Sequence, residues 1–248
     1  MDGNTTRLNK YLAESGLCSR READRIISEG RVTVNGRKAA MGDQVSSEDQ
    51  IEVNGKKIQG KNEKVVLAYY KPAGVTCTEK DRFAKKTVTE EVKYPVRVTY
   101  AGRLDKDSEG LLLMTNDGDL IEALMRGANH HEKEYMVKVN KEITPEFLET
   151  MSKGIYLEEL DKTTRPCVIR QVGKYTFQII LTQGLNRQIR RMCKACGQEV
   201  TSLKRIRINN IELKDLTQGQ LRKIEGRELE ELYQTSGLLP TDRKEIKT

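Results

Sequence analysis

Residues 101–113 read Ala-Gly-Arg-Leu-Asp-Lys-Asp-Ser-Glu-Gly-Leu-Leu-Leu, a polar loop that runs directly into an apolar segment. The apolar residues continue to Met114, and the turn Asn116-Asp117-Gly118 follows them. A short apolar run bounded by turn residues predicts a buried strand. The charged loop should therefore lie at the edge of a sheet, where a rigid scaffold can hold Asp105 and Asp107 in a site.

The same loop has two other interpretations. Its acidic spacing matches the first half of an EF-hand calcium loop. The twelfth position, however, is Asn116 rather than Glu, and Leu111–Met114 is apolar, which argues against calcium. A solvated surface turn remains open on these residues alone.

Strands and helices alternate on both sides of this loop. Val65–Tyr70 predicts a buried strand that ends in the loop Lys71–Gly74, and period-two alternation predicts strands around Tyr135–Val139 and Tyr175–Leu181. Thr144-Pro145 predicts a helix start, with Gly154 as its stop. We expect an α+β domain with a mixed, largely antiparallel sheet over residues 64–235, and a polar tail over 236–248.

The N-terminal segment predicts a separate small domain over residues 5–60. Leu8, Tyr11 and Leu12 share one helix face, and Ser19 with Glu22 forms a capping box at the start of a second helix. Short apolar alternations then flank two Asn-Gly turns, at 35–36 and 54–55, which favour hairpins. Residues 60–63 form a polar linker.

Charge indicates a nucleic-acid partner. The chain of 248 residues has a net charge of +7. Residues 183–207 hold seven basic residues against one acid, and residues 7–38 hold eight against four. Two such basic stretches suit a surface that follows a phosphate backbone. We find no apolar signal segment and no membrane-length run, and five cysteines favour reduced thiols, so a cytoplasmic location is expected.

Residues 185–197 predict a loop followed by a helix with two distinct faces. Ile189, Met192, Cys193 and Cys196 recur at helical spacing on a buried face, while the basic residues of the segment share a neighbouring face: Arg187, Arg190, Arg191 and Lys194. The Cys193-x-x-Cys196 pair has no second pair beside it, so packing is a better interpretation than a metal site.

Several motifs together resemble the RsuA/RluB/RluF family of pseudouridine synthases. The central one is Gly102-Arg103-Leu104-Asp105, followed by Ser108, Gly110-Leu111-Leu112 and the segment 115–118. Further matches are the segments 71–74, 131–135 and 184–192, and residues 7–36 resemble the S4-type (αL) RNA-binding domain that precedes the catalytic domain there. Residues 106–108 and 131–135 are most similar to the RluF branch, although many members have Thr where this chain has Ser108.

The resemblance implies an isomerase that converts uridine to pseudouridine in ribosomal RNA, with 23S rRNA as the expected substrate and tRNA as a second candidate. It implies no cofactor and no metal. Asp105 matches the family's nucleophile, Tyr135 the tyrosine that packs on the target base, and Arg190 the arginine that pairs with the aspartate. Asp107 is interpreted as a solvent-facing bystander. The expected RNA contacts are Arg103, Lys133, Asn186, Arg187 and Arg191 in the catalytic domain, and Arg7, Lys10, Arg20, Arg21 and Arg25 in the N-terminal domain.

We expect this enzyme to act as a monomer. Two other functions compete with this one. A non-catalytic ribosome-assembly factor would keep both domains without the reaction, but it has no need for Asp105, Tyr135 and Arg190 together. A metal-dependent nuclease would use Asp105 with Asp107, and it would cleave RNA only with magnesium.

Overall fold

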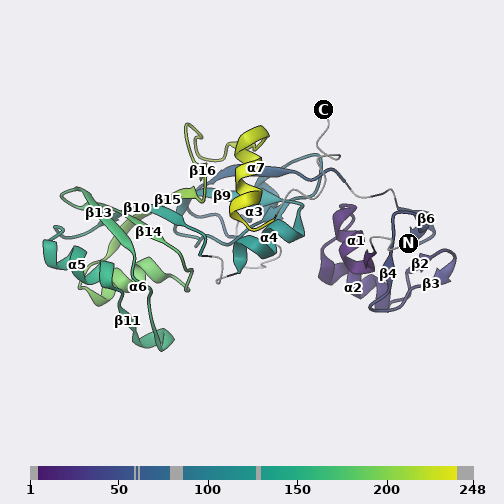
Figure 1. Cartoon of the computed structure of the whole chain (residues 1–248), viewed down its shortest axis with the longest axis horizontal. Coiled ribbons are helices and arrows are strands. Elements are labelled where there is room, and N and C mark those ends of the chain that lie inside the picture. Colours follow the sequence, from purple (N-terminus) through teal and green to yellow (C-terminus); the bar gives the residue numbers. More distant parts are fainter. Residues whose placement is uncertain (1–4, 59, 61, 79–85, 127–129, 239–248) are drawn as a thin grey trace. The chain divides into compact units, whose positions relative to one another are not determined.

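The computed structural model describes residues 5–58, 60, 62–78, 86–126 and 130–238. Its contacts divide the chain into two units (Figure 1). One unit comprises the residues up to Lys64 with the short segments 94–98 and 116–118, and the other comprises the remainder.

The N-terminal unit packs two helices against short hairpins. Ser19 accepts a hydrogen bond from the Glu22 amide at the start of the second helix, as the capping motif predicts. Asn35 and Asn54 adopt positive φ before glycines, and this closes the two predicted hairpins. The elements are β1 (Thr6–Arg7), α1 (Leu8–Glu14), α2 (Arg20–Ser28), β2 (Val32–Val34), β3 (Arg37–Lys38), β4 (Gln44–Val45), β5 (Ile51–Val53) and β6 (Lys56–Lys57).

The second unit is built on a mixed sheet, in which β13-β14-β10-β15-β9-β7-β17 are neighbours in that order. Only β9 and β15 are paired in parallel among the described strands of this sheet, so the expected mixed, largely antiparallel sheet is confirmed. Its strands are β7 (Val66–Lys71), β8 (Thr99–Tyr100), β9 (Glu109–Thr115), β10 (Lys133–Val139), β13 (Val168–Gly173), β14 (Thr176–Leu181), β15 (Val200–Ile208), β16 (Ile211–Glu212) and β17 (Leu221–Lys223).

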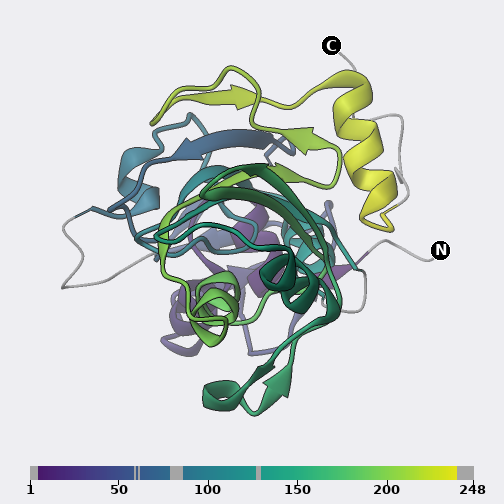
Figure 2. The ribbon, with the colours of Figure 1, turned by 90° about the vertical axis from the view of Figure 1, so that its left-hand side faces the viewer.

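Helices cover the sheet in two groups, visible in Figures 1 and 2. α5 (Pro145–Lys153) and α6 (Gln188–Ala195) pack with β10 and β14 in one apolar core, and α4 (Gly118–Met125) and α7 (Gly226–Thr235) pack with β7 and β9 in another. Thr144 caps α5 and Gly154 ends it, as predicted. The remaining elements are α3 (Val88–Glu91), a 3-10 turn (Glu158–Leu160) and the projecting hairpin β11 (Tyr156–Leu157) and β12 (Lys162–Thr163).

The segment 236–238, expected in the tail, packs on the second unit. Ser236 is buried, and Leu238 contacts the core that α4 and α7 share. The rest of the tail, residues 239–248, lies outside the described residues. Within the described part of the chain, no helix is long and apolar enough to cross a membrane.

A β-bulge at the centre of the sheet directs side chains toward the site. β10 pairs with β14 in continuous register, but against β15 the register moves from Glu134–Arg207 to Tyr135–Arg205, so Ile206 is the extra residue. In a regular strand, residues 205 and 207 would share a face. The bulge instead sends Arg205 to the face of Tyr135 and Arg207 to the face of Glu134.

Candidate active site

A buried lysine holds the loop that carries Asp105 through hydrogen bonds to backbone carbonyls. Lys71 is fully buried, and its Nζ donates to the carbonyl oxygens of Ser108 at 2.7 Å and Pro72 at 2.9 Å. Burial lowers the pKa of Lys71 to about 8. The Gly74 amide donates to the Lys106 carbonyl at 2.7 Å, and the loop also closes on itself through the Ser108 amide and the Asp105 carbonyl. The backbone around Asp105 is therefore restrained on both sides.

Two arginines face the two carboxylates of this loop. Arg187 binds Asp107 through both terminal nitrogens, at 3.0 and 2.9 Å. Its Nη1 lies 3.9 Å from the Asp105 carboxylate, whose side chain is 31% exposed. Arg190 Nε lies 3.4 Å from Asp107. The hydrogen bonds from Arg187, followed by the charge of Arg190, hold the pKa of Asp107 below its ordinary value.

This geometry corrects two expectations. Arg190 was expected to pair with Asp105, but its ion pair is with Asp107. Its Nη2 also donates to the Asp107 carbonyl at 3.0 Å and its Nη1 to the Val200 carbonyl at 3.2 Å, and these bonds hold the guanidinium at the far end of the loop. Asp107 is not a bystander, because it is the carboxylate that both arginines bind. Arg187, expected on RNA phosphate, is the arginine nearer to Asp105.

The pairing of the strands puts Tyr135 on the same face of the sheet as the Asp105 loop. Tyr135 pairs with Arg205, Arg205 with Gly110, and Gly110 with Lys71. Directly paired residues point to the same face of a sheet, and Lys71 on that face binds the loop carbonyls. Gly110 has φ of 107°, and a side chain there would collide with the Arg205 backbone, so only glycine permits this row.

Two buried cations in this site were not predicted as such. Lys71 was placed in a loop, and Arg205 was counted only in a basic stretch. Arg205 is 2% exposed, and its Nε donates to the Leu111 carbonyl at 2.7 Å. A lysine that ends a fully apolar strand was the available signal for Lys71. No local sequence pattern indicated that Arg205 is buried in the site, because the bulge decides which face of the sheet its side chain occupies.

The other predicted contacts of the catalytic domain lie at its surface or are already bound within it. Arg103 and Asn186 are exposed. Arg191 donates to the Asn186 carbonyl at 3.0 Å and forms an ion pair with Glu159 at the tip of the β11–β12 hairpin. Lys133 is half-buried on β10, two residues before Tyr135.

The predicted contacts of the N-terminal unit differ in how they are paired. Arg25 forms ion pairs with Glu22 at 2.5 Å and Glu29 at 2.9 Å, and Lys10 lies 3.7 Å from Glu14. The remaining three are exposed or at the surface, with no ion pair to another described residue: Arg7, Arg20 and Arg21.

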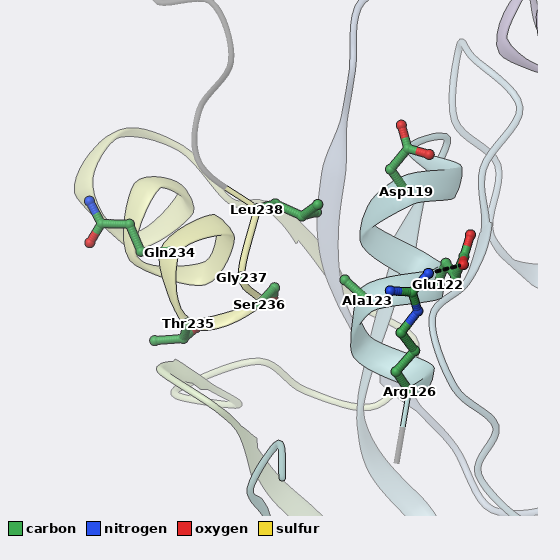
Figure 3. Close-up of a pocket in the computed structure, with 9 residues that line it drawn as sticks. All are labelled: Asp119, Glu122, Ala123, Arg126, Gln234, Thr235, Ser236, Gly237 and Leu238. Atoms are coloured by element: carbon green, nitrogen blue, oxygen red, sulfur yellow. Dashed lines mark hydrogen bonds and ion pairs between the residues drawn. The ribbon is translucent and has the colours of Figure 1, made fainter. Parts of the chain in front are cut away.

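Two features lie outside this site. Cys193 and Cys196 both pack into the core under α6, as their spacing predicts. A pocket of about 550 Å³ opens between α4 and the C-terminal end of α7, lined by residues such as Glu122, Arg126 and Ser236 (Figure 3). None of the predicted site residues lines this pocket.

Comparison with known proteins agrees with the fold and the motifs. Residues 65–195 match the RNA pseudouridylate synthase family, and residues 6–51 match the S4 domain. The chain is 45% identical to the dual-specificity RNA pseudouridine synthase RluF of Salmonella typhi, over 92% of this chain and 79% of that one. It is 38% identical to the ribosomal large subunit pseudouridine synthase B of Bacillus subtilis, over 91% and 95%.

A solved structure shares the architecture. The crystal structure of a pseudouridylate synthase superposes with a TM-score of 0.67 at 28% identity, covering 91% of this chain and 99% of that one. The resemblance inferred from the motifs is thus confirmed over most of the sequence, and so is the N-terminal S4 domain. The chain belongs to the RNA pseudouridylate synthase family, which is a family of isomerases.

Proposed function

We propose that this enzyme isomerises a specific uridine of the large-subunit (23S) ribosomal RNA to pseudouridine, with Asp105 as its nucleophile. The name of one relative supports the substrate, since the Bacillus subtilis protein is a ribosomal large subunit pseudouridine synthase. The name of the Salmonella typhi relative calls RluF dual-specific, and tRNA stays the second candidate substrate.

The observation that carries the proposal is the row Lys71, Gly110, Arg205 and Tyr135 across four strands. It supports a common site because the restrained Asp105 loop and the Tyr135 ring share one face of the sheet. An everted uridine can then lie between a carboxylate and an aromatic ring.

Each side chain has a role in this proposal. Asp105 acts on the reacting ribose or base as the nucleophile, Tyr135 packs on the uracil and accepts the C5 proton, and neither step needs a redox change. Arg187 and Arg190 are positioning residues that hold the loop through Asp107. The other exposed groups of the site contact RNA phosphates and riboses.

The arrangement of the whole chain is part of the same proposal. Residues 5–60 position the RNA, residues 64–235 catalyse the reaction, and residues 236–248 form a C-terminal segment. The enzyme acts as a monomer in the cytoplasm, where its five cysteines remain free thiols.

The test uses RNA tritiated at uridine C5, because isomerisation releases that tritium to water. We expect release by the wild-type enzyme and a loss of at least about 10³-fold in Asp105→Asn, as for removal of a nucleophile. Glu109→Gln is the matched control, since this carboxylate lies four residues further along and binds Gln218 at 2.6 Å.

The outcomes separate the competing functions. Equal release by wild type and Asp105→Asn on the correct RNA would contradict the proposed nucleophile. No release by the wild type on any ribosomal RNA would favour a binding factor. Cleaved RNA that appears only with magnesium would indicate a nuclease.

A further inference from the structure

Two cations neighbour Tyr135 in the strand pairing, and neither forms an ion pair with a carboxylate of the described residues. Lys133 lies on the same strand two residues earlier, and its ammonium donates to the His131 carbonyl at 3.4 Å. Arg205 lies opposite Tyr135 on the next strand. Within the part of the chain that the structure describes, no aspartate or glutamate lies within 4.0 Å of the charged nitrogens of either residue.

The surroundings of Arg205 are unfavourable for a charge. The side chain is almost fully buried, and its Nη2 is shielded from solvent with no hydrogen-bond partner among the described residues. Burial, followed by the charge of Arg205, lowers the pKa of Lys133 to about 8. A buried charge without a partner destabilises a fold. Such an arrangement is therefore a reason to look for an anionic or strongly polar ligand at this position.

The geometry of the strand limits what that ligand can be. Residues two apart on a strand share a face and lie about 6.6 Å apart. That is about the size of a pyrimidine ring, so the Lys133 ammonium can reach the edge of a base that packs on Tyr135. A backbone phosphate would lie outside the everted base, farther from the sheet.

We propose that Lys133 is a catalytic residue that binds a carbonyl oxygen of the target uracil and stabilises the negative charge on the detached ring. Arg205 is the positioning residue beneath it. The inference rests on the proposed function, and it makes Lys133, which the resemblance implied only as an RNA contact, a contact to the target base.

The chemistry of the isomerisation supplies this charge. When the C1′–N1 bond breaks, its electron pair stays on the uracil, where N1, C5 and the two carbonyl oxygens share it. When Asp105 acts on the ribose, its carboxylate bonds to C1′ as N1 leaves, and the ring then turns. C5 displaces the carboxylate from C1′, and the C5 proton leaves while N1 gains one. A fixed ammonium at an exocyclic oxygen stabilises the anionic stage more than the starting nucleotide, and this is the condition for catalysis.

The experiment measures single-turnover tritium release and RNA affinity separately for Lys133→Met. We expect the rate constant to fall about 10²–10³-fold, the usual cost of removing one such donor, while the RNA Kd changes less than about threefold. Lys133→Arg keeps the cation and should retain a rate within about tenfold of wild type. Lys138→Met, an exposed lysine on the same strand, is the matched control.

Each alternative gives a different result. A phosphate contact would leave the rate constant unchanged, weaken RNA binding and lower its salt dependence by about one phosphate in Lys133→Met; that result overturns the inference. If Lys133→Met lost its rate because it misfolds, its melting temperature would fall below that of the wild type. If Lys133→Arg regains the rate while its melting temperature stays as low as that of Lys133→Met, misfolding does not explain the loss of rate. If wild type releases tritium, Asp105→Asn does not, and Lys133→Met keeps its rate, only the inference fails. If wild type releases none, the proposed function fails first.

Discussion

Arg205 and Arg207 lie two positions apart on β15, yet their surroundings are opposite. Arg207 is bound by two carboxylates, Glu134 at 2.5 Å and Glu132 at 3.0 Å. Arg205 is more deeply buried and has no carboxylate within ion-pair distance among the described residues. The bulge at Ile206 separates the two, because it sends them to opposite faces of the sheet.

The difference teaches which charges of this fold maintain structure and which are held for a ligand. On the Arg207 face, the chain supplies its own counter-charges, and Gln178 adds a hydrogen bond to Glu134. Beside Arg205, Lys133 adds a second cation, and the carboxylates of the Asp105 loop on that face lie by Arg187 and Arg190 instead. We infer that the first face stabilises the sheet and that the second keeps a place for negative charge from RNA.

The largest effect that tests this comparison is the loss of activity at alkaline pH. The groups facing the Lys133 ammonium are Arg205 on β15 and His131 ahead of β10, and the facing residue of β14 is the apolar Leu181. Since the pKa of Lys133 is about 8, the rate of tritium release should fall about tenfold per unit above that pH.

Two variants show whether Lys133 causes that decline. Lys133→Arg should remove it, because guanidinium stays charged at these pH values. Arg205→Met removes a neighbouring positive charge that lowers the pKa of Lys133, so its decline should begin at higher pH, even if its rate is lower throughout. If the rate falls at the same alkaline pH in wild type, Lys133→Arg and Arg205→Met, a group other than Lys133 causes the fall. That result would contradict the distinction between the Arg205 face and the Arg207 face.

Stability gives the next largest effect, with opposite signs on the two faces. Glu134→Gln takes a charged partner from Arg207 and should lower the free energy of unfolding by about 1–3 kcal/mol. Lys133→Met removes a charge that has no carboxylate partner, so the free energy of unfolding should be unchanged or higher. Denaturant titration at pH 7.5 measures both, and a Lys133→Met variant less stable than Glu134→Gln would contradict this assignment.

The pH dependence of that stability provides an internal check. The pKa of Lys133 in the folded state, about 8, lies below its ordinary value of 10.5. Between these values the unfolded chain binds more protons, so wild-type stability gains from this group as pH rises. The advantage of Lys133→Met over wild type should therefore shrink from pH 8 to pH 10, whereas Glu134→Gln should show no such trend.

The features of the fold and the site that could be predicted from the sequence are those set by residues close together in the chain. Local patterns located the strand after Asp105, the helix that starts at Thr144 and the two Asn-Gly hairpins, because capping and turn residues act within a few positions. The buried face of α6, with Ile189 and Met192, followed from helical spacing in the same way.

The parts that were missed depend on contacts between distant segments. Arg190 was assigned to Asp105 by motif, but its partner depends on where α6 meets the loop 82–83 residues away in sequence. The direction of Arg205 depends on one extra residue in a strand pair, and a shift of one residue changes which face every later side chain occupies. α4 and α7 were not predicted from the sequence either, and both are needed to cover the opposite face of the sheet.

The smallest effect extends the comparison to the N-terminal domain, where the same distinction separates Arg21 from Arg25. Arg25 is bound by Glu22 and Glu29, whereas Arg21 is exposed with no ion pair to another described residue.

An arginine that contacts phosphate releases counterions, so Arg21→Gln should weaken RNA binding a few-fold and reduce the slope of log affinity against log salt by about 1. Arg25→Gln should leave that slope nearly unchanged, because Glu22 and Glu29 already balance its charge. Filter-binding titrations between 50 and 200 mM salt, about the range over which such contacts are lost, measure both slopes. Equal slopes for the two variants would mean that ion pairing inside the domain does not decide which arginines meet RNA.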